Sequence, residues 1–296
     1  MLTEFIHAVN QSHHQVNAVF VVEAEGISAK YEWAQGKQNF HSIGKTFAAL
    51  SLGFAINEKI IAWDERLADL YPNLVTVENQ TTLKQIKISH LASMSMGQKE
   101  GQLMMDSRAG IQDKDWAHYV VNQPFDAEIG KHFTYTNAGF YLLVRALQQR
   151  TGQSMNAFFE KRLYQPLGIG DIEWEKDPLG YDFVAGGITT TTDTLVQIAK
   201  LFINEGVIHG QTVIDPKWLK AMAQPQNIYL EVGPYTDYYG YGLWGDSRRN
   251  YYRADGAFGQ LVMVFPACKH AVVVASKEAD NEALVDLVFK HIVTKF

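Results

Sequence analysis

A serine and a lysine three residues apart, Ser42 and Lys45, stand at the head of an apolar run over residues 47–56. The run predicts a buried helix, and helix positions i and i+3 share one face, so the two side chains can touch. A serine at a helix start lies where backbone N–H groups and the helix dipole favour negative charge. A lysine amine that is shielded from water loses proton affinity and can act as a base. The pair is therefore a candidate activated nucleophile.

Two other interpretations of this stretch are open at this point. The first is structural, with Ser42 capping the helix and Lys45 pointing into solvent. The second is a phosphate-binding loop, because Gly44-Lys45-Thr46 matches the end of that motif. The motif needs a glycine at position 39, where the chain has Asn39, so only half of its pattern is present. The other motifs of the chain are needed to choose between these interpretations.

A second candidate cluster, Tyr135-Thr136-Asn137, precedes an apolar helix that we predict over residues 137–149. The Tyr135 phenol can relay a proton if a neighbouring cation lowers its pKa. The Asn137 amide can hold both a lysine and a substrate carbonyl. The structural alternative is an aromatic core residue beside a capping asparagine.

A third cluster, Ala254-Asp255-Gly256-Ala257, is the glycine-bearing end of a predicted strand. Glycine in a strand lets another backbone segment or a ligand approach closely. The N–H of Ala257 could then point to the same place as the N–H of Ser42. Two such donors would form an oxyanion hole. The structural alternative is a plain hairpin turn.

The three clusters, in this order, resemble the motifs of class C β-lactamase-like serine hydrolases. That family contains class C β-lactamases, D-alanyl-D-alanine carboxypeptidases, D-aminopeptidases and related esterases. The resemblance covers roughly residues 15–295, and its three flanking segments are 88–97, 186–193 and 239–244.

The resemblance implies a role for each motif residue. Ser42 would attack a carbonyl to give an acyl-enzyme, while Lys45 and Tyr135 move the proton. Asn137 would hold Lys45 and the substrate amide, and the N–H groups of Ser42 and Ala257 would bind the oxyanion. Water would then deacylate the enzyme, and neither a metal nor an organic cofactor is implied.

The third motif departs from the family pattern at its first position. The family usually has lysine or histidine there, and this chain has Ala254. That cation commonly binds a substrate carboxylate. Arg253 is adjacent, but strand alternation sends it to the other face, and Asp255 adds negative charge. Weak or absent β-lactamase activity is therefore expected, unless another cation replaces the missing one. Candidates are Arg248, Arg249 or a lysine of the segment 98–115.

The surrounding elements predict an α+β fold of the β-lactamase/transpeptidase type. Two strands are expected near the start, over 17–24 and 27–34, and three near the end, over 251–255, 259–265 and 271–276. They would form one antiparallel, five-stranded sheet flanked by helices.

A mostly helical domain is expected to be inserted between the two halves of this sheet. We predict a discontinuous sheet domain over 1–60 and 211–296, a helical domain over 61–210, and the site in the cleft between them. Residues 98–115 are polar and weakly patterned, which indicates a loop over the site.

Composition narrows the classes of partner. The chain has 296 residues, of which 47% are hydrophobic and 20% charged, with a net charge of −6. No basic block is present, so a nucleic-acid partner is not expected. No apolar run is long enough for a membrane span. The single cysteine, Cys268, and a start unlike a secretory signal favour the cytoplasm.

These observations favour a cytoplasmic serine hydrolase that acts through an acyl-enzyme on a small ester, amide or peptide. One alternative is a true β-lactamase, D-alanyl-D-alanine carboxypeptidase or D-aminopeptidase. Another is a non-catalytic ligand-binding or sensor protein with the same fold. The aromatic residues Tyr238, Tyr239, Tyr241 and Trp244 could line a pocket or belong to the core.

Overall fold

The structure is a computed structural model that describes residues 1–12, 14–226, 230 and 233–296. The α-helices are α1 (Thr3–Ser12), α2 (Gly44–Asn57), α3 (Leu67–Leu70), α4 (Gln80–Leu83), α5 (Ile88–Ala92), α6 (Trp116–Val121), α7 (Ala138–Thr151), α8 (Met155–Phe159), α9 (Gln165–Leu167), α10 (Thr192–Ile203), α11 (Pro216–Ala223) and α12 (Asn281–His291). The strands are β1 (Val16–Glu23), β2 (Ile27–Glu32), β3 (Gln38–Asn39), β4 (Glu173–Trp174), β5 (Ile188–Thr190), β6 (Val207–Ile208), β7 (Gln211–Thr212), β8 (Tyr238–Tyr239), β9 (Trp244–Asp246), β10 (Tyr251–Gly256), β11 (Gln260–Phe265) and β12 (His270–Ser276). A π-helical turn spans Glu160–Tyr164, and 3₁₀ turns span His41–Ile43, Pro72–Leu74, Arg108–Gly110 and Val293–Lys295.

The main sheet is antiparallel, and within the described residues it has seven strands in the order β2-β1-β12-β11-β10-β9-β8. All five predicted strands are present, which confirms the α+β fold. The sheet is wider than predicted because β8 and β9 extend it. These strands have only two and three residues, too few for an alternating pattern to reveal them.

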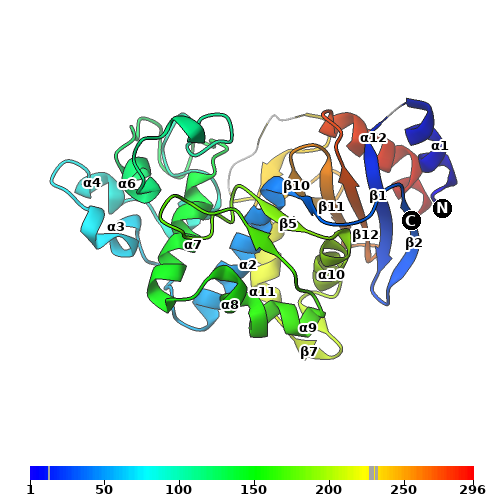
Figure 1. Cartoon of the computed structure of the whole chain (residues 1–296), viewed down its shortest axis with the longest axis horizontal. Coiled ribbons are helices and arrows are strands. Elements are labelled where there is room, and N and C mark those ends of the chain that lie inside the picture. Colours follow the sequence, from blue (N-terminus) through cyan, green and yellow to red (C-terminus); the bar gives the residue numbers. More distant parts are fainter. Residues whose placement is uncertain (13, 227–229, 231–232) are drawn as a thin grey trace.

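Both faces of the main sheet are covered, so its central strands are apolar on both sides. Val19 and Val21 of β1 pack with α1 and α12, while Phe20 and Val22 belong to the larger core on the other face. This split follows from the alternation of side chains along a strand. Figure 1 shows α1 and α12 together beside β1, close to both chain termini.

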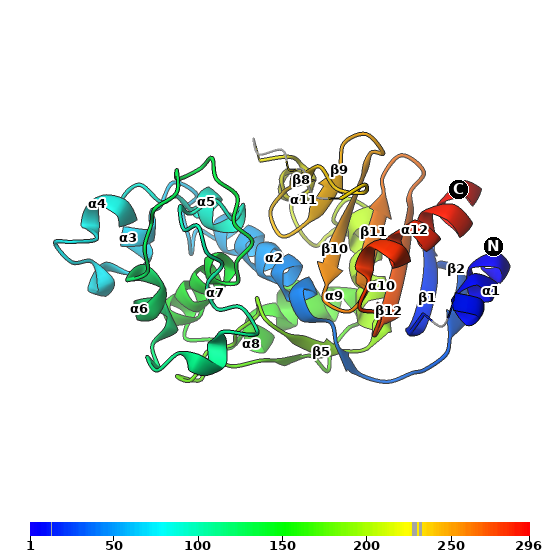
Figure 2. The same ribbon diagram turned by 90° about the horizontal axis from the view of Figure 1, so that it is seen from above.

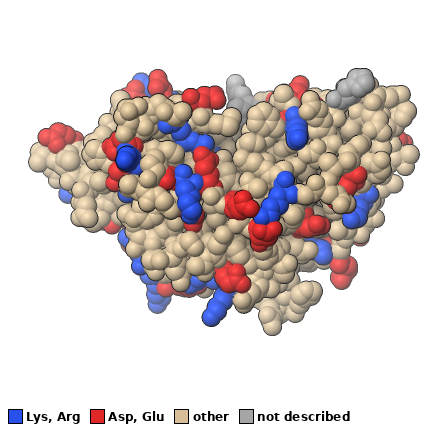
Figure 3. Space-filling view, in the orientation of Figure 1, with Lys and Arg blue, Asp and Glu red and all other residues tan. Residues whose placement is uncertain are grey.

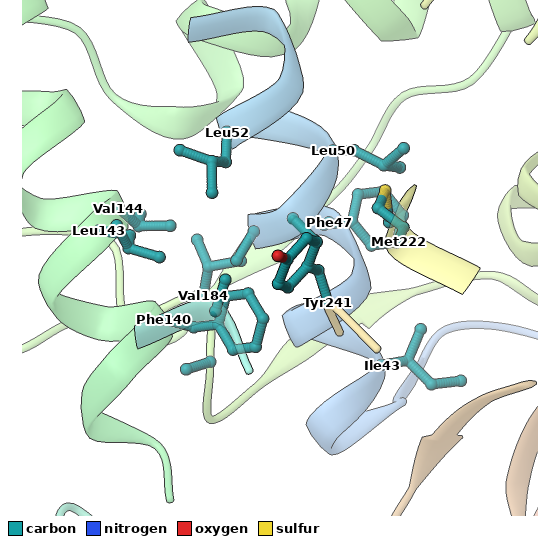
Figure 4. Close-up of a cluster of buried hydrophobic side chains, with 14 of the residues drawn as sticks. Ile43, Phe47, Leu50, Leu52, Phe140, Leu143, Val144, Val184, Met222 and Tyr241 are labelled. Carbon is teal, nitrogen blue, oxygen red and sulfur yellow. The ribbon is translucent and has the colours of Figure 1, made fainter. Parts of the chain in front are cut away.

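Helix α2 is the central element of the larger core. Every residue from Gly44 to Ala55 is buried, which is typical of a helix enclosed on all sides. Figure 2 shows α2 between the main sheet and a group of helices that includes α3, α6 and α7. In Figure 4, Leu52 lies on the α7 side with Leu143, and Leu50 lies on the α11 side with Met222. Packing against several distant segments thereby holds α2 in place.

The predicted boundaries at 60/61 and 210/211 stay a prediction. Helix α10, within the range predicted as helical, packs on β11 and β12 of the main sheet. The segment 98–115 is irregular apart from one 3₁₀ turn, as predicted for a loop.

No helix in the described part of the chain is long and apolar enough to cross a membrane. Figure 3 shows basic and acidic side chains interspersed over the visible face.

Candidate active site

Ser42 lies in the 3₁₀ turn that leads directly into α2. Its side chain caps neither this turn nor α2, because neither helix start has a side-chain cap hydrogen bond. Lys45, one turn further, is only 1% exposed. The interpretation of Ser42 as a cap and Lys45 as a solvated side chain is therefore wrong.

The Lys45 side chain is held between Ser42 and a main-chain carbonyl. Its Nζ lies 2.9 Å from Ser42 Oγ and donates to the Ala185 oxygen at 2.8 Å. This approach depends on Gly44, because any side chain there would collide with the carbonyl oxygen of Val184. The segment carrying Ala185 can thus lie directly against the first turn of α2.

Burial changes the acid–base behaviour of this lysine. Desolvation, with a smaller contribution from the positive charge of Arg108, lowers the pKa of Lys45 to about 7. A substantial fraction of the amine is then neutral at neutral pH. A neutral amine within hydrogen-bond distance of a serine hydroxyl can accept its proton.

Tyr135 occupies the space between this lysine and the sheet. Its ring centroid is 4.8 Å from Lys45 Nζ, and its ring stacks on Trp244 with centroids 5.6 Å apart. Burial raises the pKa of the Tyr135 phenol, and a hydrogen-bond interaction with Ser42 offsets this only in part. The phenol therefore stays neutral at ordinary pH and can pass a proton on.

Asn137 follows on the same segment but has different partners from those expected. Its Nδ2 donates to the Leu103 oxygen at 2.7 Å, which fixes the loop over the site. No hydrogen bond joins it to Lys45 among the described residues, since the lysine uses Ala185 instead. The Asn137 Oδ1 is buried and has no partner in the described part of the chain. This oxygen can accept a hydrogen bond only if a ligand or water supplies the donor.

The end of β10 lies next to the turn that carries Ser42. Gly256 makes this possible, because a side chain there would collide with the carbonyl oxygen of Phe40. Ala257, the next residue, lines the same cavity as Ser42. The structure thus brings together the two residues whose N–H groups are the predicted oxyanion donors.

The position at which the family usually has a cation is apolar and buried in this structure. Ala254 is buried in the core, while Arg253 and Asp255 both line the cavity. Arg253 Nε lies 2.9 Å from Asp255 Oδ2, and Asn281 Nδ2 donates to the other carboxylate oxygen at 2.9 Å. The charge of Arg253 is therefore largely neutralised where it meets the cavity.

The cations proposed as replacements lie elsewhere. Arg248 and Arg249 both pair with the buried carboxylate of Asp246 and do not line the cavity. The segment 98–115 does supply a cation, although it is Arg108 and not a lysine. Its guanidinium lies over the Phe183 ring and pairs with Glu175 at 2.9 Å.

Ser42, Tyr135, Asn137 and Ala257 line one cavity of about 680 Å³. Its lining is His41, Ser42, Met104, Met105, Asp106, Arg108, Tyr135, Asn137, Gly186, Gly233, Thr236, Trp244, Arg253, Asp255, Gly256, Ala257, Asn281 and Glu282. Of the four aromatic residues at 238–244, Trp244 lines this cavity, while Tyr238, Tyr239 and Tyr241 are buried elsewhere in the packing.

Sequence patterns did not reveal Ala185 or Arg108. Ala185 acts through its main-chain carbonyl, which every residue type has, so its identity gives no signal. The glycines that follow it do indicate that another segment can approach closely here. Arg108 lies in a loop without periodicity, so only the folded chain shows that it reaches the cavity.

Comparison with known proteins adds a family match. The sequence profile of the family described as Beta-lactamase matches residues 38–292. A comparison with curated protein sequences found no significant match.

Several solved structures share the fold over nearly the whole chain. A candidate beta-lactamase from Bacteroides dorei has a TM-score of 0.80 and 16% identity, with 99% of both chains covered. A candidate 6-aminohexanoate-dimer hydrolase from Bacillus anthracis has a TM-score of 0.77 and 14% identity, covering 98% of this chain and 80% of the other. The octameric penicillin-binding protein homologue from Pyrococcus abyssi has a TM-score of 0.77 and 14% identity, covering 99% and 76%. At these identities the likeness concerns the fold.

Proposed function

Because the chain belongs to the beta-lactamase family, we propose that it is a serine hydrolase that cleaves a small ester or amide through an acyl-enzyme. The observation that carries the proposal is the contact of 2.9 Å between Lys45 Nζ and Ser42 Oγ. Because the pKa of Lys45 is lowered to about 7, its neutral amine can act as a base toward the Ser42 hydroxyl.

In acylation, Ser42 Oγ bonds to the carbonyl carbon and its proton moves to Lys45. The N–H groups of Ser42 and Ala257 stabilise the negative oxygen that forms. The bond to the leaving group then breaks, and the leaving group takes the proton from Lys45 by way of the neutral Tyr135 hydroxyl. Water repeats the sequence on the ester carbonyl of the acyl-enzyme and releases the acid and free Ser42.

The cavity favours substrates without a carboxylate. The family's cation is replaced by Ala254, and the charges of Arg108 and Arg253 are already paired with carboxylates. Two acidic side chains on the lining, Asp106 and Glu282, have no basic partner among the described residues. A negatively charged substrate would be repelled, whereas an uncharged acyl group can lie against the apolar wall formed by Met104, Met105 and Trp244.

A substrate panel tests this proposal. We expect measurable turnover of p-nitrophenyl acetate and p-nitrophenyl butyrate, with kcat/KM at least about fivefold higher than for benzylpenicillin, since one unpaired charge is worth roughly 1 kcal/mol or more in such a site. Ser42→Ala provides the background rate. A preference for benzylpenicillin or for a D-alanyl-D-alanine peptide would contradict the substrate class and favour a β-lactamase or carboxypeptidase.

A further inference from the structure

Two residues with left-handed backbone flank the predicted oxyanion donors. His41 precedes Ser42 and has φ of 49°, and Phe258 follows Ala257 and has φ of 65°. This conformation is unfavourable for residues with a Cβ, above all for a bulky aromatic residue such as Phe258. Strain of this kind persists only where the surrounding structure imposes it, and it gathers at functional sites.

The side chains of these two residues meet. The rings of His41 and Phe258 contact each other with centroids 5.1 Å apart and planes at 57°. Phe258 is 42% exposed, so burial in the core does not explain its position. His41 is half-buried and lines the cavity.

Each of the two turns also has a hydrogen bond of its own. The His41 N–H donates to Asn39 Oδ1 at 2.8 Å, and the Gly259 N–H donates to Asn281 Oδ1 at 2.7 Å. Next to the two rings in sequence, Gly256 lies directly against the carbonyl oxygen of Phe40. The segment before Ser42 and the segment around Ala257 therefore contact each other twice, at Phe40 with Gly256 and at His41 with Phe258.

We propose that the His41 and Phe258 rings form a clasp that holds the N–H groups of Ser42 and Ala257 at the separation an oxyanion requires. The inference rests on the proposed serine hydrolase function and adds two positioning residues to it. Neither side chain takes part in bond making. The clasp acts on the transition state, because the oxyanion forms only there, and not on binding of the uncharged ester.

The test measures hydrolysis of p-nitrophenyl acetate and inhibition by phenylboronic acid, which forms a tetrahedral adduct on serine. In Phe258→Ala, kcat should fall about tenfold, less than the loss of a whole oxyanion donor, with KM changed less than about twofold. The Ki of phenylboronic acid should rise by a similar factor. A merely structural role would not couple Ki to kcat in this way.

Two substitutions at position 41 separate backbone conformation from ring contact. His41→Asn suits the left-handed backbone but lacks the ring, so it should lose as much kcat as Phe258→Ala. His41→Phe keeps the ring contact but suits the left-handed backbone less well than His41→Asn, so a kcat above that of His41→Asn would assign the effect to the ring. The double variant His41→Asn/Phe258→Ala should be no worse than either single variant, because all three break one contact.

Two further variants serve as a substitute and as a control. Phe258→Gly also suits a left-handed backbone and replaces Phe258→Ala if that variant does not fold. His209→Ala is the matched control, since His209 has φ of 50° in the turn between β6 and β7 and does not line the cavity; its kcat should equal that of the wild type.

The outcomes separate the clasp from the proposed function. If the wild type is active and the variants at positions 41 and 258 keep its kcat and Ki, the clasp is contradicted but the hydrolase function is not. Multiplying losses in the double variant would contradict it as well. A wild-type protein without turnover would contradict the hydrolase function, and the clasp with it.

Discussion

The side-chain nitrogen of Lys45 lies 2.8 Å from the main-chain carbonyl oxygen of Ala185. A carbonyl oxygen can only accept a hydrogen bond, so the amine must direct one N–H toward it. The lone pair of the neutral amine is then free to face Ser42 Oγ, 2.9 Å away. Ala185 therefore orients the candidate base, a role that the family resemblance assigns to Asn137.

The pH dependence of hydrolysis should follow the ionisation of Lys45. Only its neutral form can accept the Ser42 proton, and burial lowers its pKa to about 7. We therefore expect kcat/KM for p-nitrophenyl acetate to rise with pH through about 7 as a single ionisation and to level off above it. A profile that is flat from pH 5 to 9, or an apparent pKa near 10, would remove Lys45 as the base.

Arg108 and Glu175 should shift that profile in opposite directions. Arg108 contributes to lowering the pKa of Lys45, and Glu175 pairs with Arg108. Arg108→Gln leaves a negative charge nearby and should move the acid limb to higher pH, while Glu175→Gln should move it to lower pH. Shifts of the same sign, measured from kcat/KM between pH 5.5 and 9, would show that the ion pair acts only through folding.

Tyr135→Phe should lower kcat about 10²-fold or more, the scale of a lost proton relay. The substitution keeps the ring that stacks on Trp244, so the melting temperature should change little. Tyr239→Phe is the matched control, because Tyr239 is also buried and also packs on Trp244, with centroids 4.8 Å apart, but it does not line the cavity. Equal activities of the two variants would mean that the Tyr135 hydroxyl carries no proton.

Asp255→Asn should change substrate preference through charge. The substitution removes the carboxylate that neutralises Arg253 at the cavity wall. The ratio of kcat/KM for a succinate monoester to that for the uncharged butyrate ester should rise roughly five- to tenfold, in line with about 1 kcal/mol for one charge in a partly exposed site. An unchanged ratio would mean that substrate does not approach this wall.

The parts of the site that local geometry determines were predictable from the sequence. Ser42 and Lys45 meet because they are one helical turn apart, and the apolar run after them correctly indicated a buried helix. Five strands of six to eight residues were visible as apolar or alternating segments, whereas β8 and β9 were too short.

Long-range contacts could not be predicted in the same way. Ala185 reaches Lys45 across 140 positions of sequence and uses only its backbone. Arg108 lies in an irregular loop without a sequence pattern, and its position at the cavity depends on contacts with Phe183 and Glu175. The left-handed backbone of Phe258 has no signature in residue type, because glycine or asparagine would be the expected choice.

Intact-mass analysis after exposure to a small fluorophosphonate tests the central claim most directly. A competent serine with an assembled oxyanion hole should form one covalent adduct per chain, and Ser42→Ala should form none. Adduct formation that persists in Ser42→Ala would place the nucleophile elsewhere. A folded wild type without any adduct would contradict a working Ser42–Lys45–Tyr135 site and would favour a ligand-binding protein of the same fold.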